Sequence, residues 1–257
     1  SLEDNLMRLF GSERIAKMSK LERFNVNKSR RYTVLNFLAS GEYWTTAENV
    51  RLLFGVKHLS YVRRFLDTLI DDDLLSKRAI SSGGTPRNYY SITDRGLAFV
   101  DKFEKYKAGK LSHQTMFHNE LVQRLRIMSL NIFGEALKWR TDIEIQRTES
   151  EFKSIPDAVL TLNKTYSIEL QRNIYSYDGL VKKISKCLDD CYNERFDFIL
   201  FVCCENLTAE RLKTMFTKVD KVKNTRGEDV ILLAEDREKF IFIDFNNFEE
   251  FIENEKI

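Results

Sequence analysis

The sequence predicts a two-part α/β chain of the α+β kind, and three observations carry this prediction. Residues 29–103 show helical periodicity interrupted by one hairpin pattern, whereas residues 134–243 contain several brief apolar runs typical of strands. The length of 257 residues, with 43% hydrophobic and 31% charged residues, allows two hydrophobic cores. No run of about 18 apolar residues occurs and no signal peptide is recognisable. We therefore expect no membrane span and a cytoplasmic location.

The charges are divided unevenly along the chain, although the net charge is only +2. Residues 18–110 hold 17 Lys and Arg against 10 Asp and Glu, whereas residues 111–257 hold 21 against 26. A basic amino-terminal part suits a polyanionic partner. We expect one domain over residues 18–110 and a second over residues 111–257.

Residues 1–17 form an amphipathic helical pattern that resembles a segment of the bacterial preprotein translocase ATPase. Nothing else in the chain resembles that protein, and no Walker-type phosphate loop is present. Met18 then begins a sequence that looks like a natural start. We expect residues 1–17 to be the remnant of a fusion.

The amino-terminal domain reads as three helices followed by a two-stranded hairpin and one more helix. The first helix, 29–39, ends at Gly41, and a Thr-Thr-Ala-Glu capping box at 45–48 opens the second. Gly55 makes the turn into the third. The remaining elements are the third helix at 57–69, strands at 74–78 and 88–92 around a Gly-rich tip, and a helix from Thr93 through Phe103.

This order is that of a winged helix-turn-helix, and the close YYSITDRG is similar to the end of many such domains. The resemblance implies a third helix in the major groove of DNA and a wing near phosphate or the minor groove. A winged helix that docks on protein is the alternative. The candidate DNA contacts are Lys57, His58, Ser60, Tyr61, Arg63, Arg64 and Arg87.

The carboxy-terminal domain predicts a mixed sheet with flanking helices. A long amphipathic helix over 111–133 is followed by the stretch ALKWRTDIEIQR (136–147), which we expect to be a strand. The expected elements after that are strands at 158–162 and 166–171, a helix at 174–192, a strand at 197–203, a helix at 207–222 and strands at 230–233 and 240–243. Four cysteines, at 187, 191, 203 and 204, lack zinc-site spacing, so we expect buried reduced thiols.

The two strands at 158–171 read as a β-hairpin whose register follows from its apolar pattern. A three-residue turn at 163–165 pairs Leu160 with Ile168 and leaves one face apolar. That register places Asp157 opposite Gln171, with Glu169 on the same face. Two close carboxylates repel each other unless a cation lies between them, and Mg²⁺ prefers such oxygen ligands. An ordinary solvated strand face is the alternative.

The Pro-Asp before one strand and Glu-x-Gln in the next resemble the PD-(D/E)xK motif of restriction-endonuclease-like proteins. The resemblance implies that Asp157 and Glu169 hold Mg²⁺ or Mn²⁺ for phosphodiester cleavage. Gln171 stands where that motif has lysine, and Glu120 matches an extra acid seen in part of the superfamily. Gln171 can orient water but carries no charge, so a lysine elsewhere, Lys182 or Lys183, would have to supply it.

The combination of motifs resembles the replication-relaxation family, which includes MobC-type plasmid mobilisation relaxases. This combination consists of the winged helix, one helix that carries His113, His118, Asn119 and Glu120, a strand that contains Trp139, and the motifs PDAVL and YSIELQ. The resemblance implies a bacterial protein that nicks a plasmid transfer origin together with other mobilisation proteins and a coupling protein. Tyr175 and Tyr177 are candidate nucleophiles, with packing or base stacking as the alternative. His113 and His118 are candidate phosphate contacts or ordinary helix-face residues.

Three functions therefore stay open at the level of sequence. The first is a DNA-nicking relaxase with metal-dependent cleavage. The second is a DNA-binding accessory protein or regulator of plasmid transfer or replication with a degenerate nuclease fold, which the glutamine at 171 favours. The third is a restriction or repair endonuclease that cuts both strands.

Overall fold

The computed structural model describes residues 19–81, 86–102, 113–148, 152–224 and 226–255. The expected helix at 1–17 and most of the expected hairpin tip lie outside these ranges. The chain forms two compact units that divide between Ile127 and Met128. The division falls inside helix α7 (His113–Phe133), beyond the boundary at residue 110 that composition and pattern predict.

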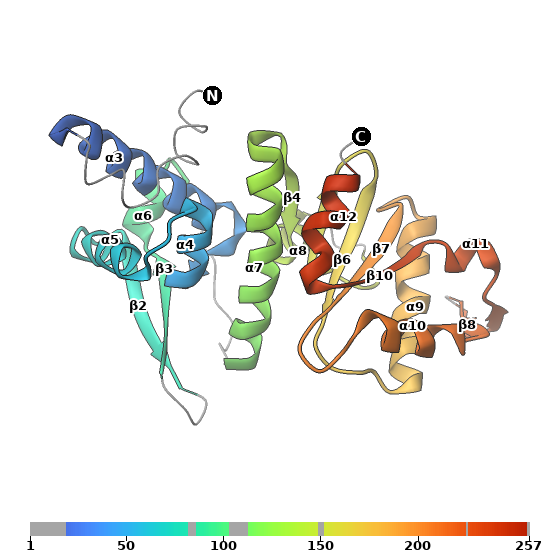
Figure 1. Ribbon diagram of the computed structural model, residues 1–257. Coiled ribbons are helices and arrows are strands. Elements are labelled where there is room, and N and C mark those ends of the chain that lie inside the picture. Colours follow the sequence, from blue (N-terminus) through green and yellow to red (C-terminus); the bar gives the residue numbers. More distant parts are fainter. Residues whose placement is uncertain (1–18, 82–85, 103–112, 149–151, 225, 256–257) are drawn as a thin grey trace. The chain divides into compact units, whose positions relative to one another are not determined.

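The first unit combines helices with a three-stranded antiparallel sheet (Figure 1). Its helices are α3 (Lys20–Phe37), a π-turn at Leu38–Glu42, α4 (Ala47–Phe54), α5 (Leu59–Asp71), α6 (Asp94–Phe99) and the first part of α7. Its strands are β1 (Trp44–Thr45), β2 (Leu75–Ile80) and β3 (Arg87–Ile92), in the order β1-β3-β2. The two-residue strand β1 is too short to be read from alternation, and the sequence did not predict it.

Polar caps fix where the helices of the first unit begin. The Thr46 hydroxyl accepts from the Asn49 amide, so α4 starts one residue later than a Thr45–Glu48 box would place it. The Thr93 hydroxyl caps α6 through the Gly96 amide. Gly96 also allows a close approach, because a Cβ there would lie 2.3 Å from the Leu74 carbonyl oxygen. The Thr-Asp-Arg-Gly sequence therefore fits α6 tightly against the start of the hairpin.

One stripe of α5 forms much of the first unit's core. Val62, Phe65, Leu66 and Leu69 are buried there, at the spacing of one helix face. Burying each such side chain contributes about 1.5–3 kcal/mol. The opposite face of α5 is thereby left to solvent.

The second unit is built on a five-stranded mixed sheet, ordered β10-β7-β6-β5-β4, with helices on both faces (Figure 1). The mixed α/β class predicted from sequence is confirmed. The central strands are β4 (Lys138–Thr141), β5 (Ala158–Thr161), β6 (Thr165–Gln171), β7 (Phe198–Cys203) and β10 (Phe240–Asp244). Strands β6, β7 and β10 run parallel, and β4, β5 and β6 pair antiparallel.

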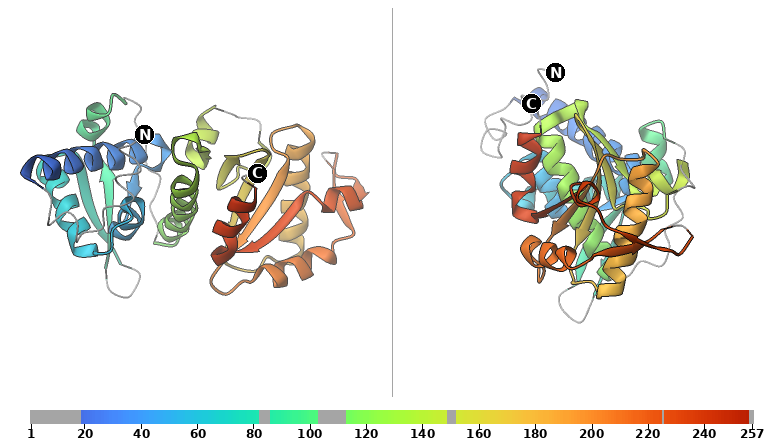
Figure 2. Two further views of the ribbon diagram at one scale, coloured as in Figure 1. Left: turned by 45° about the horizontal axis from the view of Figure 1, so that its top comes forward. Right: turned by 90° about the vertical axis from the view of Figure 1, so that its right-hand side faces the viewer.

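Helices cover both faces of this sheet. Ile184 and Cys187 of α9 (Tyr177–Tyr192) and Leu212 of α10 (Ala209–Thr217) share a core with Phe201 of β7. On the other face, Phe251 of α12 (Phe248–Asn254) meets Tyr166 edge-on. Figure 2 shows α12 and α9 on opposite sides of the strands. The remaining elements are α8 (Asp142–Thr148), α11 (Ala234–Arg237), short 3₁₀ turns at Gly134–Ala136 and Phe245–Asn247, and a ribbon of β8 (Lys221–Lys223) and β9 (Asp229–Ile231).

The pairing predicted for the hairpin of β5 and β6 is wrong by two residues. Ala158 pairs with Ile168 and Leu160 with Tyr166, because the three-residue turn lies at 162–164. The Leu162 amide closes it by donating to the Lys164 carbonyl, and Thr161 faces Thr165. A shift of two residues preserves the side-chain alternation, so the apolar face stays as predicted.

Other boundaries also differ from expectation. Residues Asp142–Thr148 are helical, not part of the preceding strand, because Thr141 and Glu144 form a capping box. Helix α10 ends at Thr217, and the chain then enters the ribbon that takes β9 out of the central sheet. Helix α12 was not predicted. Among the described helices, none has the length and apolarity that crossing a bilayer would require.

Candidate functional site

Asp157 lies immediately before β5 and contacts the backbone of β6. Its amide donates to the Ile168 carbonyl at 3.0 Å, and its Oδ2 accepts from the Leu170 amide at 2.7 Å. Both bonds place Asp157 beside Glu169. The register predicted from the sequence had instead placed Asp157 opposite Gln171. The two predicted acids therefore come together, although by a different pairing.

Glu169 is buried on β6, with 6% of its surface exposed, and forms an ion pair with Lys183 of α9. The Lys183 Nζ lies 2.6 Å from Glu169 Oε1. The same Nζ donates to the Ser154 hydroxyl at 2.8 Å. Lys183 thus joins the strand acid to the loop that leads into Asp157.

The charge on Lys183 is set by its neighbours. Burial by itself would lower the pKa of Lys183, but the attraction of the carboxylates, Glu169 first and Asp157 to a smaller extent, raises it above its ordinary value. Lys183 is therefore cationic at neutral pH. Lys182, the alternative considered from sequence, is exposed to solvent.

The loop before Asp157 is anchored by Asp190, which the sequence did not single out. The Asp190 carboxylate accepts from the amides of Lys153 and Ser154 at 3.0 and 3.1 Å, and Arg195 Nε lies 3.4 Å away. Asp190 has no exposed surface. A single Asp in helix α9 gives no local signal of this role, because its partners lie 36 and 37 residues away in sequence.

The two tyrosines considered as nucleophiles occupy different environments. Burial, then Glu169 and to a smaller extent Cys187 and Asp157, raise the pKa of the Tyr175 phenol. Its ring packs edge-on against Phe201. Tyr177 is half exposed and donates to the Lys218 carbonyl at 3.3 Å. The surroundings of Tyr175 oppose a phenolate, which favours its packing role.

Gln171 ends β6, two residues beyond Glu169. Its side-chain amide donates to the Asn173 carbonyl at 2.5 Å. Residues two apart on a strand share a face, so Gln171 lies on the same face of the sheet as Glu169, at the end of the central strand β6. The structure thus has a neutral amide at this position and the cationic Lys183 on the neighbouring helix.

Glu120 is held inside the first unit by two arginines. The Glu120 Oε1 lies 2.7 Å from Arg87 and 2.8 Å from Arg124, and the residue has no exposed surface. Burial raises the pKa of Glu120 more than these arginines lower it. The guanidinium of Arg87 also lies over the ring of Phe117, 5.4 Å from its centroid. Arg87 is therefore engaged with α7, whereas the sequence had placed it at an exposed hairpin tip.

A buried polar network binds this part of α7 to the first unit. Gln123 accepts from Thr45 and Asn49 at 2.6 and 2.9 Å, and donates to Trp44 and Glu42 at 2.8 and 3.0 Å. All donor and acceptor positions of its amide are used. His118 is partly buried on the same helix. His113 begins α7, but its side chain lies outside the described residues.

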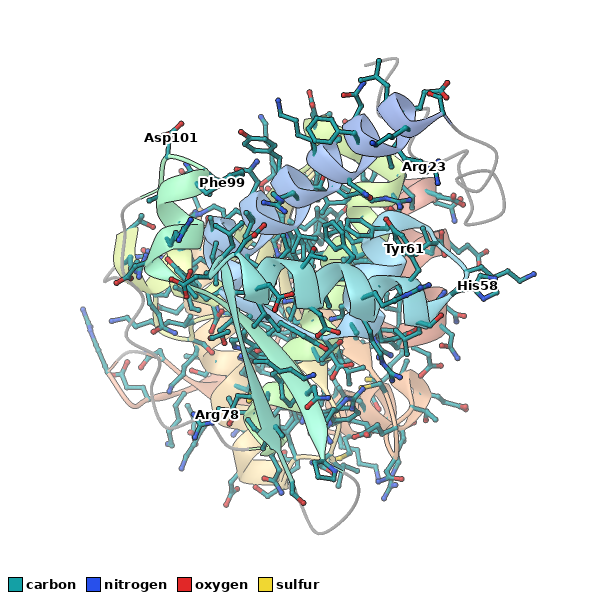
Figure 3. All side chains as sticks on the ribbon, turned by 90° about the vertical axis from the view of Figure 1, so that its left-hand side faces the viewer. Arg23, His58, Tyr61, Arg78, Phe99 and Asp101 are labelled. Carbon is teal, nitrogen blue, oxygen red and sulfur yellow. The ribbon has the colours of Figure 1, made fainter. Side chains whose placement is uncertain are left out.

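The solvent face of α5 and its entry turn carries most of the predicted nucleic-acid contacts. Lys57, His58, Ser60, Arg63 and Arg64 are exposed. Figure 3 shows His58 and Tyr61 toward one end of this face and Arg78 of β2 below it.

Tyr61 differs from the other predicted contacts, because its hydroxyl accepts from Arg30 at 2.7 Å and donates to Asn27 at 3.0 Å. The buried Arg30 guanidinium lies over the rings of Phe54 and Tyr61. Tyr61 therefore helps to position α5 against α3.

The acids fit a hard divalent cation in kind and in charge. When ionised, Asp157 and Glu169 carry two negative charges against the one positive charge of Lys183. Mg²⁺ is commonly bound by one or two carboxylates, with water and substrate phosphate completing its shell. No group of three His, Cys, Asp or Glu side chains in the described ranges is arranged for a metal.

Comparison with protein-family models, curated proteins and solved structures gives no match for this chain.

Proposed function

We propose that the chain is a DNA-binding endonuclease that nicks DNA by metal-dependent phosphodiester cleavage. The observation that carries the proposal is the meeting of Asp157, Glu169 and Lys183 at one end of the mixed sheet. A buried lysine bound to a strand carboxylate supplies the positive charge that Gln171 lacks. In this proposal the second unit is a nuclease domain of the PD-(D/E)xK type. Its lysine is supplied by the helix that follows the strand, not by the strand itself.

The amino-terminal unit would bind the DNA. Its helices, its β2–β3 hairpin and the exposed basic residues of α5 support the proposal that it is a winged helix whose α5 enters the major groove. The net charge of residues 18–110 favours the same assignment. Cleavage of one strand at a plasmid transfer origin, with other mobilisation proteins and a coupling protein, is the specific form that the motif resemblance suggests.

The side chains of the second unit would divide the chemistry. Asp157, fixed by the Leu170 amide, and Glu169 would hold Mg²⁺ or Mn²⁺. Such an ion, when bound, lowers the pKa of water and stabilises charge on a phosphate. Lys183 would contact the scissile phosphate or the developing negative charge, and Ser154 holds its ammonium in position. Gln171 would orient the attacking water through its amide.

The proposed nicking activity is tested by incubating supercoiled plasmid with the full chain and Mn²⁺ or Mg²⁺. We expect conversion to relaxed circles, and its loss in Asp157→Ala and in Glu169→Gln. Duplex binding should be nearly unchanged in both variants, because the basic residues of α5 are untouched. Linear product would instead indicate a double-strand endonuclease. Normal nicking by both variants would show that the acids have been misassigned.

A second candidate is a DNA-binding accessory protein or regulator without cleavage activity. The bond from Gln171 to Asn173 favours it, because that bond turns the amide toward its own backbone. The ion pair of Glu169 with Lys183 could likewise serve stability alone. Plasmid that stays supercoiled with both metals, in the presence of measurable DNA binding, would support this candidate.

A further inference from the structure

A groove of about 690 Å³ lies between α3, α5 and α6 of the first unit. Its size matches that of pockets for small organic ligands. Phe24, Tyr61, Phe65 and Phe99 supply its aromatic lining. Figure 3 shows Tyr61 and Phe99 on the same side of this unit, beside α3.

Two of these rings are open to solvent. Phe24 is 65% exposed and Phe99 is 37% exposed, and Phe99 lies 5.0 Å from the ring of Tyr32. Tyr61 is partly exposed, and its hydroxyl is already bonded to Arg30 and Asn27. The rings therefore offer apolar faces at the rim of the groove.

The rest of the lining is cationic or neutral and polar. Lys28, Arg31 and Arg64 line the groove, together with Asn27 and Thr68. Asp72 forms an ion pair with Arg31 at 2.6 Å but does not line the groove. Among the residues that the structure describes, neither an acidic nor an aliphatic side chain is part of this lining.

We infer that this groove binds single-stranded nucleic acid, with bases stacked on its rings and phosphates held by its cations. Channels for single strands combine aromatic platforms with basic residues in this way. A duplex hides the faces of its bases, so it would not use the rings. An apolar peptide would be expected to meet aliphatic side chains, and here it would meet three cations.

This inference goes beyond cleavage and does not depend on Asp157 or Glu169. Binding can therefore be measured in EDTA, where metal-dependent cutting is suppressed. A failure of the nuclease proposal would leave the result of this measurement unaffected. The probe is a fluorescently labelled oligothymidylate, compared with the same strand lacking its bases and with a duplex of equal length.

The test uses the full-length variant Phe24→Ala/Phe99→Ala. Loss of one stacked base costs about 5-fold or more in affinity, so we expect the oligothymidylate Kd to rise about 25-fold or more. The wild-type chain should bind the strand without bases about as weakly as the variant binds oligothymidylate. Duplex affinity should change little, and circular dichroism should confirm that the variant is folded.

Leu21→Ala is the matched control, because Leu21 is 69% exposed on the same helix but does not line the groove. It should bind oligothymidylate like the wild type. A second variant, Lys28→Gln/Arg64→Gln, removes two cations from the groove. The slope of log affinity for oligothymidylate against log salt should therefore become shallower by about 1.4. Unchanged single-strand affinity in Phe24→Ala/Phe99→Ala would overturn the inference. Conversion of a dimer to a monomer by that variant, with binding unchanged, would likewise overturn it by indicating a self-association surface.

Discussion

At the scale of single residues, replacing Lys183 is the most direct test of the proposed nuclease activity. It is largely buried and bound to Glu169 and Ser154. Replacing it with methionine removes the charge while keeping a similar length. We expect Lys183→Met to lower the nicking rate by about 10²-fold or more, the typical loss when one charge-stabilising donor is removed. The rate of loss of supercoiled plasmid measures this.

Stability must be kept apart from activity in this experiment. Removing one partner of a buried ion pair costs about 3–5 kcal/mol, because the other charge is left uncompensated. The double variant Lys183→Met/Glu169→Gln removes both charges and should recover much of the stability without recovering nicking. Lys182→Met is the matched surface control and should behave like the wild type. Wild-type nicking by a folded Lys183→Met variant would restrict Lys183 to a structural role.

The cysteines give a pH-dependent prediction. Burial, then repulsion from Glu205, raises the pKa of Cys204 to about 11 against the opposing effect of Arg172. The reactive thiolate is therefore scarce at neutral pH and increases about tenfold per pH unit below that value. Cys204 is the only partly exposed thiol among the four, since Cys187, Cys191 and Cys203 are buried.

Iodoacetamide labelling followed by peptide mass spectrometry checks this prediction. We expect Cys204 to be labelled first in the native protein, slowly at pH 7 and about tenfold faster at pH 8. Cys187 should be labelled only after denaturation, because burial raises its pKa well above the ordinary value. Rapid labelling of Cys187 in the native protein at neutral pH would contradict the packing around α9.

At the scale of elements, local patterns predicted which segments fold together better than they predicted exact pairing. The apolar face of β5 and β6 was recoverable because alternation determines which side chains share a face. The register was not, because a three-residue turn at 162–164 and one at 163–165 preserve the same face. The hydrogen bond that the Leu170 amide donates to the Asp157 carboxylate, which no hydrophobic pattern encodes, accompanies the observed register.

The sequence around helix α8 carries two conflicting signals, one for a strand and one for the start of a helix, and the prediction followed the wrong one. The Ile143 and Ile145 alternation suggested a continued strand, yet Thr141-Asp-Ile-Glu144 has the spacing of a capping box. By contrast, the pairing of Glu169 with Lys183 depends on α9 packing against β6. The sequence offered two neighbouring lysines, Lys182 and Lys183, and only the tertiary fold shows that Lys183 is the one that pairs with Glu169.

The cap of α8 can be tested directly. The Glu144 carboxylate accepts from the Thr141 amide at 2.9 Å, and the Glu144 amide donates to the Thr141 hydroxyl at 3.3 Å. Glu144→Ala removes the first bond, so we expect a loss of about 1 kcal/mol in the free energy of unfolding, the usual cost of a lost hydrogen bond. Glu144→Gln should retain most of it, because glutamine also forms capping boxes. Urea unfolding measures both, and equal losses would argue against the cap.

At the scale of the whole molecule, the boundary between the two compact units differs from the boundary that the charge composition predicts. The basic excess ends near residue 110, whereas the first compact unit extends to Ile127. The reason is the buried network of Glu120 and Gln123, which commits the start of α7 to the first unit. The sequence alone placed the boundary at residue 110 because the charge distribution and the element pattern change there, and neither feature reveals the buried contacts of Glu120 and Gln123.

The last prediction separates DNA binding from cleavage within the full chain. Arg63 and Arg64 lie on the exposed face of α5. If each neutralises a phosphate, Arg63→Gln/Arg64→Gln should weaken duplex binding and reduce the slope of log affinity against log salt by about 2. Nicking at saturating DNA should persist, because Asp157, Glu169 and Lys183 are unchanged.

The matched control for this double variant is Arg211→Gln/Lys213→Gln, which removes two exposed cations from α10 of the second unit. Titration at several salt concentrations should show a wild-type slope for the control. If the α5 variant also keeps the wild-type affinity and slope, α5 does not lie against phosphate. The basic face of the first unit would then be better explained as a protein-docking surface, and recognition of duplex DNA would have to be sought outside α5.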